Sequence, residues 1–409
     1  MSCIMTQVTI DRLGYQGDGI AQGPLYVPGT LPGETVTGTP DGQTLRDVRI
    51  DTPSSDRVKP PCVHAKSCGG CQLQHASDGF LADWKAGVVR NALLAHGIEA
   101  EIRPIETSPP LSRRRASFSA RRTKKGALAG FHMKASDVVV SIPNCQLLHP
   151  DLTAALPMVE QLAVLGSSRK GELSVLVTKS EVGLDVAVTG GKPADTALRG
   201  ALAKIADEHD LARLCWDDET LLRRRPYQIF GNARVTPPAG SFLQATAEGE
   251  AALQRAVLSI VDGATHVADL FSGSGTFALP IARTAAVHAV EGEKAMIAAL
   301  NEGWRMAEGL RRVTCEARDL FRNPLLPEEL KRFDAIVIDP PRAGAEAQVA
   351  EIASIRTPKV AHVSCNPVTF ARDTATLLAA GYRLDWVQPV DQFRWSTHVE
   401  LVASLSLDI

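Results

Sequence analysis

The chain has 409 residues, of which 44% are hydrophobic and 22% charged, and its formal net charge at pH 7 is −2. This is the composition of an ordinary globular protein, and the near-neutral charge argues against a general nucleic-acid binder. No apolar run approaches the ~20 residues that span a membrane. Residues 1–13 also lack the basic and apolar segments of a signal peptide. We therefore expect two or three domains and a cytoplasmic protein.

The first predicted unit is a small β barrel over residues 1–58. Short alternating segments such as Gln7–Leu13 and Gly33–Gly38 are separated by glycines, prolines and Asp-Gly pairs. Strands at this spacing favour a small antiparallel barrel, a fold that often presents one face to single-stranded nucleic acid. A β-rich cap without that role is the alternative.

Cysteines open the next predicted unit, residues 59–240. Three of the eight cysteines follow the pattern Cys62-x5-Cys68-x2-Cys71, and Cys145 comes much later. Four thiolates can hold a [4Fe–4S] cluster or a structural zinc ion. Three close cysteines and one distant one favour iron–sulfur over paired zinc knuckles. Unrelated buried cysteines remain the third interpretation.

Helical spacing follows over residues 78–96. Its apolar positions predict one shared face, made of Phe80, Trp84, Val88, Leu93 and Leu94. Alternating strands are predicted next, at 116–120 and 127–131, then at 173–178 and 183–189, with a helix over 195–209.

A basic segment covers the first two of these strands. No acidic residue lies between Glu106 and Asp137. The same stretch contains eight basic residues: Arg113, Arg114, Arg115, Arg121, Arg122, Lys124, Lys125 and Lys134. Arginines carried on strands predict a surface that binds phosphate groups of a nucleic acid. A solvated charged face is the alternative.

The last third, 241–409, alternates helical patterns with short apolar runs. The runs that read as strands are His266–Leu270, Val287–Val290, Val313–Glu316, Ala335–Ile338 and Val360–Val363. This βαβ rhythm predicts an α/β domain with a doubly wound, Rossmann-like parallel sheet. Ligands of such sheets bind beyond the carboxyl ends of the strands.

Three strand ends carry features of a nucleotide-type pocket. The first run ends in a glycine loop, Asp269–Phe277, whose backbone can approach a cofactor closely. Glu291 ends the second run and could accept hydrogen bonds from ribose hydroxyls, and Asp319 follows the third. The pattern is that of S-adenosylmethionine (SAM) binding, with NAD as the rival. Each acid taken singly could instead cap a helix.

The fourth and fifth runs deliver reactive groups. Asp339-Pro340-Pro341-Arg342 forms a stiff lip, because proline fixes φ and offers no backbone N–H. Cys365 follows the fifth run and could act as a nucleophile, although a lone cysteine is more often a small buried hydrophobe. Glu400, near the terminus, is a candidate base or an exposed edge glutamate.

Together these motifs resemble the SAM-dependent RNA 5-methyluridine methyltransferases, in particular the iron–sulfur branch with an N-terminal TRAM barrel that acts on 23S ribosomal RNA. The resemblance runs from about Val8 to Leu405. It rests on the barrel, the four cysteines, the Arg113–Arg115 strand, Ser241-Phe-Leu-Gln244, the glycine loop, Asp339-Pro-Pro-Arg-Ala-Gly, Ser364-Cys-Asn-Pro and His398-x-Glu400.

The resemblance implies a role for each candidate residue. SAM would be bound by Gln244, Phe271, Thr276, Glu291, Asp319 and Asp339. Cys365 would be the nucleophile that adds to C6 of a uridine, and Glu400 the base that removes the C5 proton. A [4Fe–4S] cluster would be held by Cys62, Cys68, Cys71 and Cys145. The RNA partner would be a single-stranded loop, with no membrane and no obligate protein partner.

Three positions depart from the family pattern. Phe393-Arg394-Trp395-Ser396 stands where the family usually has Phe-Pro-His-Thr, which places the choice of RNA target in doubt more than the chemistry. Thr246 replaces a common asparagine and Ser272 a frequent cysteine. The alternatives to ribosomal RNA are a transfer-RNA uridine, a non-catalytic RNA-binding iron–sulfur protein, and a radical-SAM methylthiotransferase, which needs a different cysteine spacing.

Overall fold

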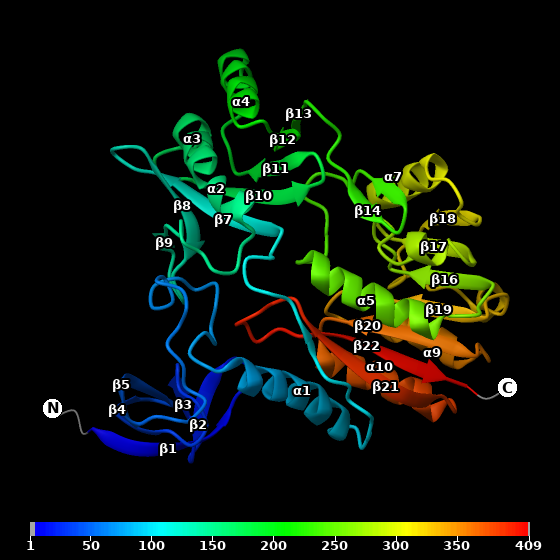
Figure 1. The fold of residues 1–409 in the computed structure, drawn as a ribbon, viewed down its shortest axis with the longest axis horizontal. Helices are drawn as coiled ribbons and strands as arrows, with labels where there is room; N and C mark the ends of the chain where they lie inside the picture. The colour runs from blue at the N-terminus through cyan, green and yellow to red at the C-terminus, as the bar shows by residue number, and fades with distance from the viewer. Residues whose placement is uncertain (1–4, 408–409) are drawn as a thin grey trace.

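The computed structural model describes residues 5–407, so Cys3 and the first four residues of the segment considered for a signal peptide lie outside the described part. The chain begins with the predicted barrel, which is closed in the order β1-β2-β3-β5-β4 (Figure 1). Its strands are β1 (Thr6–Leu13), β2 (Asp18–Ala21), β3 (Leu25–Pro28), β4 (Thr35–Asp41) and β5 (Thr44–Thr52). Ile10, Val27 and Val36 fill its core.

A single long helix, α1 (Asp78–Leu94), leads away from the barrel. Ser77 caps it by accepting a hydrogen bond from the N–H of Phe80 at 3.2 Å. The helix packs on the C-terminal α/β unit through α10 and β21. The predicted apolar face is confirmed at Leu93, and Phe80 and Trp84 pack partly buried beside Leu73 and Trp395. The other buried positions, Leu81, Lys85 and Val89, were not predicted, and Leu94 is exposed.

The central part is a seven-stranded sheet in the order β13-β12-β11-β10-β7-β8-β9. The strands are β7 (Arg115–Arg122), β8 (Ala127–His132), β9 (Val139–Val140), β10 (Glu172–Ser180), β11 (Gly183–Thr189), β12 (Arg213–Trp216) and β13 (Glu219–Leu222). Its helices are α2 (Pro150–Ala154), α3 (Leu156–Gly166) and α4 (Thr196–Glu208), with α3 and α4 together above the sheet in Figure 1. A hairpin of β14 (Gln228–Phe230) and β15 (Ala233–Val235) follows and packs against α7.

The C-terminal part is the predicted α/β fold, an eight-stranded sheet in the order β18-β17-β16-β19-β20-β22-β21-β6. Its strands are β6 (Glu106–Thr107), β16 (His266–Leu270), β17 (Ala286–Glu291), β18 (Val313–Ala317), β19 (Ala335–Ile338), β20 (Lys359–Ser364), β21 (Arg383–Asp391) and β22 (Glu400–Ser406). Its helices are α5 (Ala247–Ile260), α6 (Ala278–Ile281), α7 (Lys294–Met306), α8 (Pro327–Leu330), α9 (Glu346–Ala353) and α10 (Pro367–Ala379).

Strands β18, β17, β16, β19 and β20 run parallel, whereas β22 is antiparallel to both of its neighbours. One apolar layer packs α5, α6 and α7 on one face of the sheet, and a second packs α1, α9 and α10 on the other. Because both faces are covered, every residue of β19 is buried. The carboxyl ends of the parallel strands are left to form a site.

Within residues 5–407, no helix combines the length and the apolar character that crossing a bilayer requires.

Candidate active site

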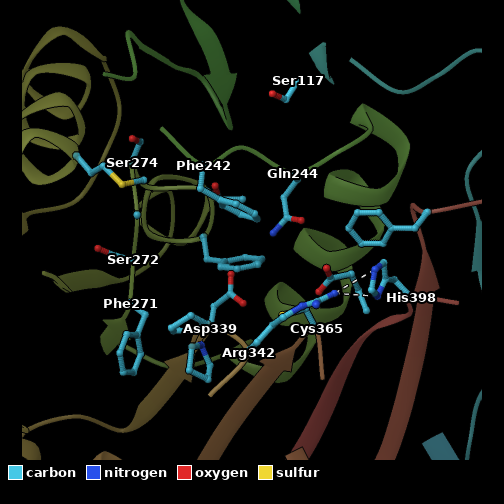
Figure 2. A pocket seen from close by; sticks show the side chains of 18 of the residues that line it. Ser117, Phe242, Gln244, Phe271, Ser272, Ser274, Asp339, Arg342, Cys365 and His398 are labelled. Carbon is cyan, nitrogen blue, oxygen red and sulfur yellow. Dashed lines mark hydrogen bonds between the residues drawn. The ribbon is translucent and has the colours of Figure 1, made fainter. Parts of the chain in front are cut away.

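A cavity of about 860 Å³ opens at the carboxyl ends of the parallel strands. Every residue predicted to bind SAM or to react lines it: Gln244, Phe271, Thr276, Glu291, Asp319, Asp339, Cys365 and Glu400. Figure 2 shows the side chains of Asp339, Arg342 and Cys365 below that of Gln244. The fold therefore gathers into one space residues that the sequence spreads over the last third of the chain.

The glycine loop after β16 has the backbone conformation that its sequence predicts. Gly273 and Gly275 have φ angles of 55° and 99°, in the left-handed region that favours glycine. A methyl group at Gly275 would lie 2.9 Å from carbon atoms of both Leu279 and Leu300, so the loop can pack this closely only with glycine there. The N–H of Gly273 donates to Glu291 at 3.0 Å, which fixes the carboxylate at the rim of the cavity.

The thiol and the carboxylate of the proposed chemistry come from neighbouring strands. In the antiparallel pairing of β20 with β22, Ser364 lies opposite Leu401. The next positions along the two strands are Cys365 and Glu400, which therefore lie beside each other. Glu400 is 4% exposed, and both residues line the cavity.

Burial shifts the ionisation of these groups. Desolvation and the Asp339 carboxyl raise the pKa of Glu400 to about 8. Desolvation and then Glu291 raise the pKa of Asp339 to about 7. Desolvation, Glu400 and Asp339 raise the pKa of the Cys365 thiol to about 12, while Arg342 acts in the opposite direction. Without ligands, the cavity thus keeps the Cys365 thiol protonated at neutral pH.

Arg342 supplies the positive charge of this cluster, a role that sequence reasoning did not assign. Its Nη2 lies 2.8 Å from Nδ1 of His398, and Asn366 donates to its carbonyl oxygen at 2.9 Å. Burial and the Arg342 charge lower the pKa of His398, so the imidazole is neutral and can accept a hydrogen bond from the guanidinium. The Asp-Pro-Pro-Arg motif could have predicted this role, because Arg342 lies in the sequence between the acid Asp339 and the candidate nucleophile Cys365.

The last residue of β21 and the segment that joins it to β22, together residues 391–399, form one wall of the cavity. A buried ion pair joins Asp391 to Lys85 of α1 at 2.7 Å. Gln392 donates to Oε1 of Gln244 at 2.5 Å and accepts from the N–H of Ala245 at 2.8 Å. Because its oxygen is engaged, Gln244 can offer its NH₂ group to the cavity.

The four predicted ligand cysteines lie around a second, smaller cavity of about 20 Å³. The N–H of Gly70 donates to the sulfur of Cys68 at 3.4 Å. Gly70, Phe131 and Leu147 line both cavities, so the cysteine site and the large cavity share a wall. Within residues 5–407, no group of three or more His, Cys, Asp or Glu side chains has the close arrangement that one metal ion requires.

The predicted basic segment divides into two parts. Arg114, Arg121 and Lys134 form ion pairs with acids from elsewhere in the chain, at 2.6, 2.5 and 3.2 Å. Arg113 instead lines the large cavity, where its guanidinium lies 5.4 Å from the ring of Phe393. Burial and then the charge of Arg115 lower the pKa of Arg113. Among the hydrogen bonds of the described residues, only its Nε is engaged, in a bond to the carbonyl oxygen of Arg115 at 3.0 Å. This arginine is therefore available to a ligand anion.

Comparison with known proteins finds a family model for the last part of the chain and relatives that match nearly all of it. The family model described as tRNA (uracil-5-)-methyltransferase matches residues 233–406. An uncharacterized RNA methyltransferase of Rhizobium meliloti is 45% identical over 97% of this chain and 98% of its own length. The 23S rRNA (uracil(1939)-C(5))-methyltransferase RlmD of Shewanella piezotolerans is 31% identical over 98% of this chain and 95% of its own length.

The crystal structure of the tRNA (uracil-54, C5)-methyltransferase of Pyrococcus abyssi with S-adenosyl-L-homocysteine covers 98% of this chain and 99% of its own. The TM-score is 0.77 at 22% sequence identity, so the two chains share a fold.

Proposed function

The chain belongs to the RNA (uracil-5-)-methyltransferase family and is a SAM-dependent RNA methyltransferase; from that premise we propose that it methylates C5 of a 23S ribosomal RNA uridine through a covalent adduct with Cys365. One observation carries the mechanism. A thiol and a carboxylate from adjacent strands, Cys365 and Glu400, line the same cavity as the glycine loop.

The chemistry explains why both groups are needed. C5 of uracil is a weak nucleophile, and the Cys365 thiolate activates it by forming a bond to C6, which moves an electron pair toward C5 and O4. SAM supplies an electrophilic methyl group, which C5 takes while the C–S⁺ bond breaks to leave S-adenosylhomocysteine. Glu400 then removes the C5 proton, and the C6–S bond breaks to release Cys365 and the 5-methyluridine.

The charges of the cavity favour this order of events. The Cys365 thiol is protonated in the free cavity, and Arg342 is the cation that favours its thiolate. A bound sulfonium adds a second positive charge and lowers the pKa of the thiol further. The thiolate would thus be favoured when the methyl donor is bound.

For SAM itself we propose the six residues that the sequence suggested. The fixed Glu291 carboxylate is suited to ribose hydroxyls, because its hydrogen bond to the N–H of Gly273 holds it in place. Phe271 and Phe321, whose ring centroids are 5.4 Å apart, offer an apolar wall near Asp319. Gln244, Thr276 and Asp339 would complete the pocket.

We also propose that Cys62, Cys68, Cys71 and Cys145 hold a [4Fe–4S] cluster. The fit rests on the donor set, since four thiols face one cavity and a backbone N–H already donates to one sulfur. One zinc ion would need its donors about 2.3 Å from a single point. A cluster is larger than one ion and spreads its ligands farther apart. Its role would be structural, and it would lie beside the wall that the cysteine site shares with the active-site cavity.

The cluster assignment predicts that Cys71→Ser abolishes iron binding. Protein purified without oxygen should contain about four irons per chain, and the variant should lose them and melt at least about 5 °C lower, because the ligand set stabilises the fold. Iron analysis and thermal unfolding measure the two effects. The matched control is Cys215→Ser, a buried cysteine of β12 that lies away from this cavity. Stoichiometric zinc without iron would contradict the assignment.

The RNA target is tested by mapping 5-methyluridine in cells that lack the protein. The relative named for 23S rRNA is 31% identical over 98% of this chain, whereas the transfer-RNA enzyme of Pyrococcus abyssi is 22% identical over the same share, which supports ribosomal RNA. We expect one or more 5-methyluridines of 23S rRNA to disappear and transfer RNA to keep its own. Loss from transfer RNA alone would instead support a transfer-RNA substrate, as for the Pyrococcus abyssi enzyme.

A further inference from the structure

The barrel touches the active-site wall through the turn between β1 and β2. Leu13, which ends β1, packs in one buried cluster with Trp395 and Leu73. Gly17, which precedes β2, lies close to Thr397. A methyl group added at Gly17 would be 3.0 Å from Cγ2 of Thr397. Both ends of the turn are thus docked on residues 391–399.

Tyr15 is the side chain held between these two anchors. The turn around it is closed by backbone hydrogen bonds from Gly14 to Asp18 and from Gly17 to Gly14, at 2.8 and 2.9 Å. The Tyr15 side chain is 50% exposed. The residues that this turn contacts, Trp395 and Thr397, alternate with Ser396 and His398, which line the cavity, and the charge of Arg342 acts on the Tyr15 phenol. A rigid turn therefore presents an aromatic ring beside the wall of the active-site cavity.

This ring has no aromatic partner among residues 5–407. An aromatic ring that is half exposed near a guanidinium group is the kind of surface on which unpaired RNA bases stack. The methyl donor is an unsuitable occupant. The glycine loop that would hold it follows β16, whereas Cys365 follows β20, and β19, which ends before Asp339, lies between these two strands. A phosphate would instead meet the phenol hydroxyl, a contact that Tyr15→Phe removes while it keeps the ring.

We propose that Tyr15 is a substrate-positioning residue of the barrel and stacks on the unpaired RNA base next to the target uridine. This inference rests on the proposed function and adds a specific contact to it. The barrel would then take part in selecting the RNA loop at the active site itself. Once the neighbouring base is stacked, the flipped uridine stays beside Cys365.

The test uses Tyr15→Ala, Tyr15→Phe and Tyr15→Leu in the full chain, with a synthetic stem–loop of 23S rRNA that the wild-type enzyme methylates. Tyr15→Ala should raise KM for this RNA about tenfold, which lies within the range for one stacked base. Tyr15→Phe should stay close to wild type because it keeps the ring. Tyr15→Leu keeps apolar volume without the ring and should behave like the alanine variant.

A second RNA series isolates the contact. An abasic nucleotide is placed on either side of the target uridine in turn. At one of these positions the abasic change should raise KM for wild type about tenfold and have no further effect on Tyr15→Ala. The matched control is Tyr26→Ala, a 40% exposed tyrosine on β3 of the same barrel, which should behave as wild type.

The results separate the two proposals. If Tyr15→Ala and Tyr15→Leu keep the wild-type KM, or if the abasic penalty adds in full to that of Tyr15→Ala, the stacking role is wrong while the methyltransferase assignment stands. If wild type methylates no uridine RNA, both fail. Melting midpoints and SAM affinity equal to wild type would show that a change in KM does not come from misfolding.

Discussion

Replacing Cys365 by alanine is expected to abolish methylation of RNA, with a loss of at least about 10³-fold in rate. Among the described residues that line the cavity, Cys365 is the only thiol, so no neighbour can replace it as the nucleophile. Transfer of a tritiated methyl group from SAM to RNA measures the rate. Cys365→Ser should be nearly as inactive, because a hydroxyl is a far weaker nucleophile than a thiolate.

Two controls make this result specific. SAM affinity, measured by calorimetry, should stay close to wild type in Cys365→Ala, because the six residues proposed to bind SAM are unchanged. Cys315→Ala removes a partly buried thiol from β18 of the same sheet and should leave the rate unchanged. Methylation at a normal rate by purified Cys365→Ala would refute the covalent scheme.

The α/β part of the fold could be predicted in detail because its strands are buried on both faces. Such strands read as continuous apolar runs, and the predicted run Ala335–Ile338 is β19 itself. The polar residue that follows each run marks a strand end. Parallel strands place these ends at one edge, so the sequence could also predict that Asp339 and Cys365 come together.

The buried face of α1 could be predicted only in part, because its key residue breaks the usual rule. Lysine is almost never fully buried without a partner, so the pattern placed Lys85 outside. Its partner, Asp391, lies far along the chain and becomes a neighbour only in the folded protein. Removing either charge leaves the other buried and unpaired, which typically costs about 3–5 kcal/mol.

The free charges of the basic segment were hard to predict for the same reason, because the partners of its arginines lie far along the chain. No acid occurs within it, yet Arg114 reaches Glu250 of α5 and Arg121 reaches Glu172 of β10. The number of free positive charges was therefore overestimated. For Arg113 the prediction of a ligand-facing arginine agrees with its place in the cavity wall. Tyr15 carried no signal in the sequence, since its role depends on how the barrel docks.

Replacing Glu400 by glutamine is expected to stop the reaction after methyl transfer. Glutamine has nearly the size of glutamate but cannot accept the C5 proton, so the C6–S bond to Cys365 cannot break. A protein–RNA complex that survives denaturing electrophoresis should accumulate, with a mass equal to protein plus RNA plus one methyl group. Turnover should fall at least about 10³-fold, while the first methyl transfer persists.

The double variant Cys365→Ala/Glu400→Gln should give no such complex, because the bond to RNA requires the thiol. Glu250→Gln, which alters another buried carboxylate outside the cavity, should give none either. The pKa of about 8 for Glu400 adds a pH test. Release of wild-type enzyme from RNA should quicken as pH rises toward 8, because only the ionised carboxylate accepts the proton. A Glu400→Gln enzyme that turns over normally would mean that another group is the base.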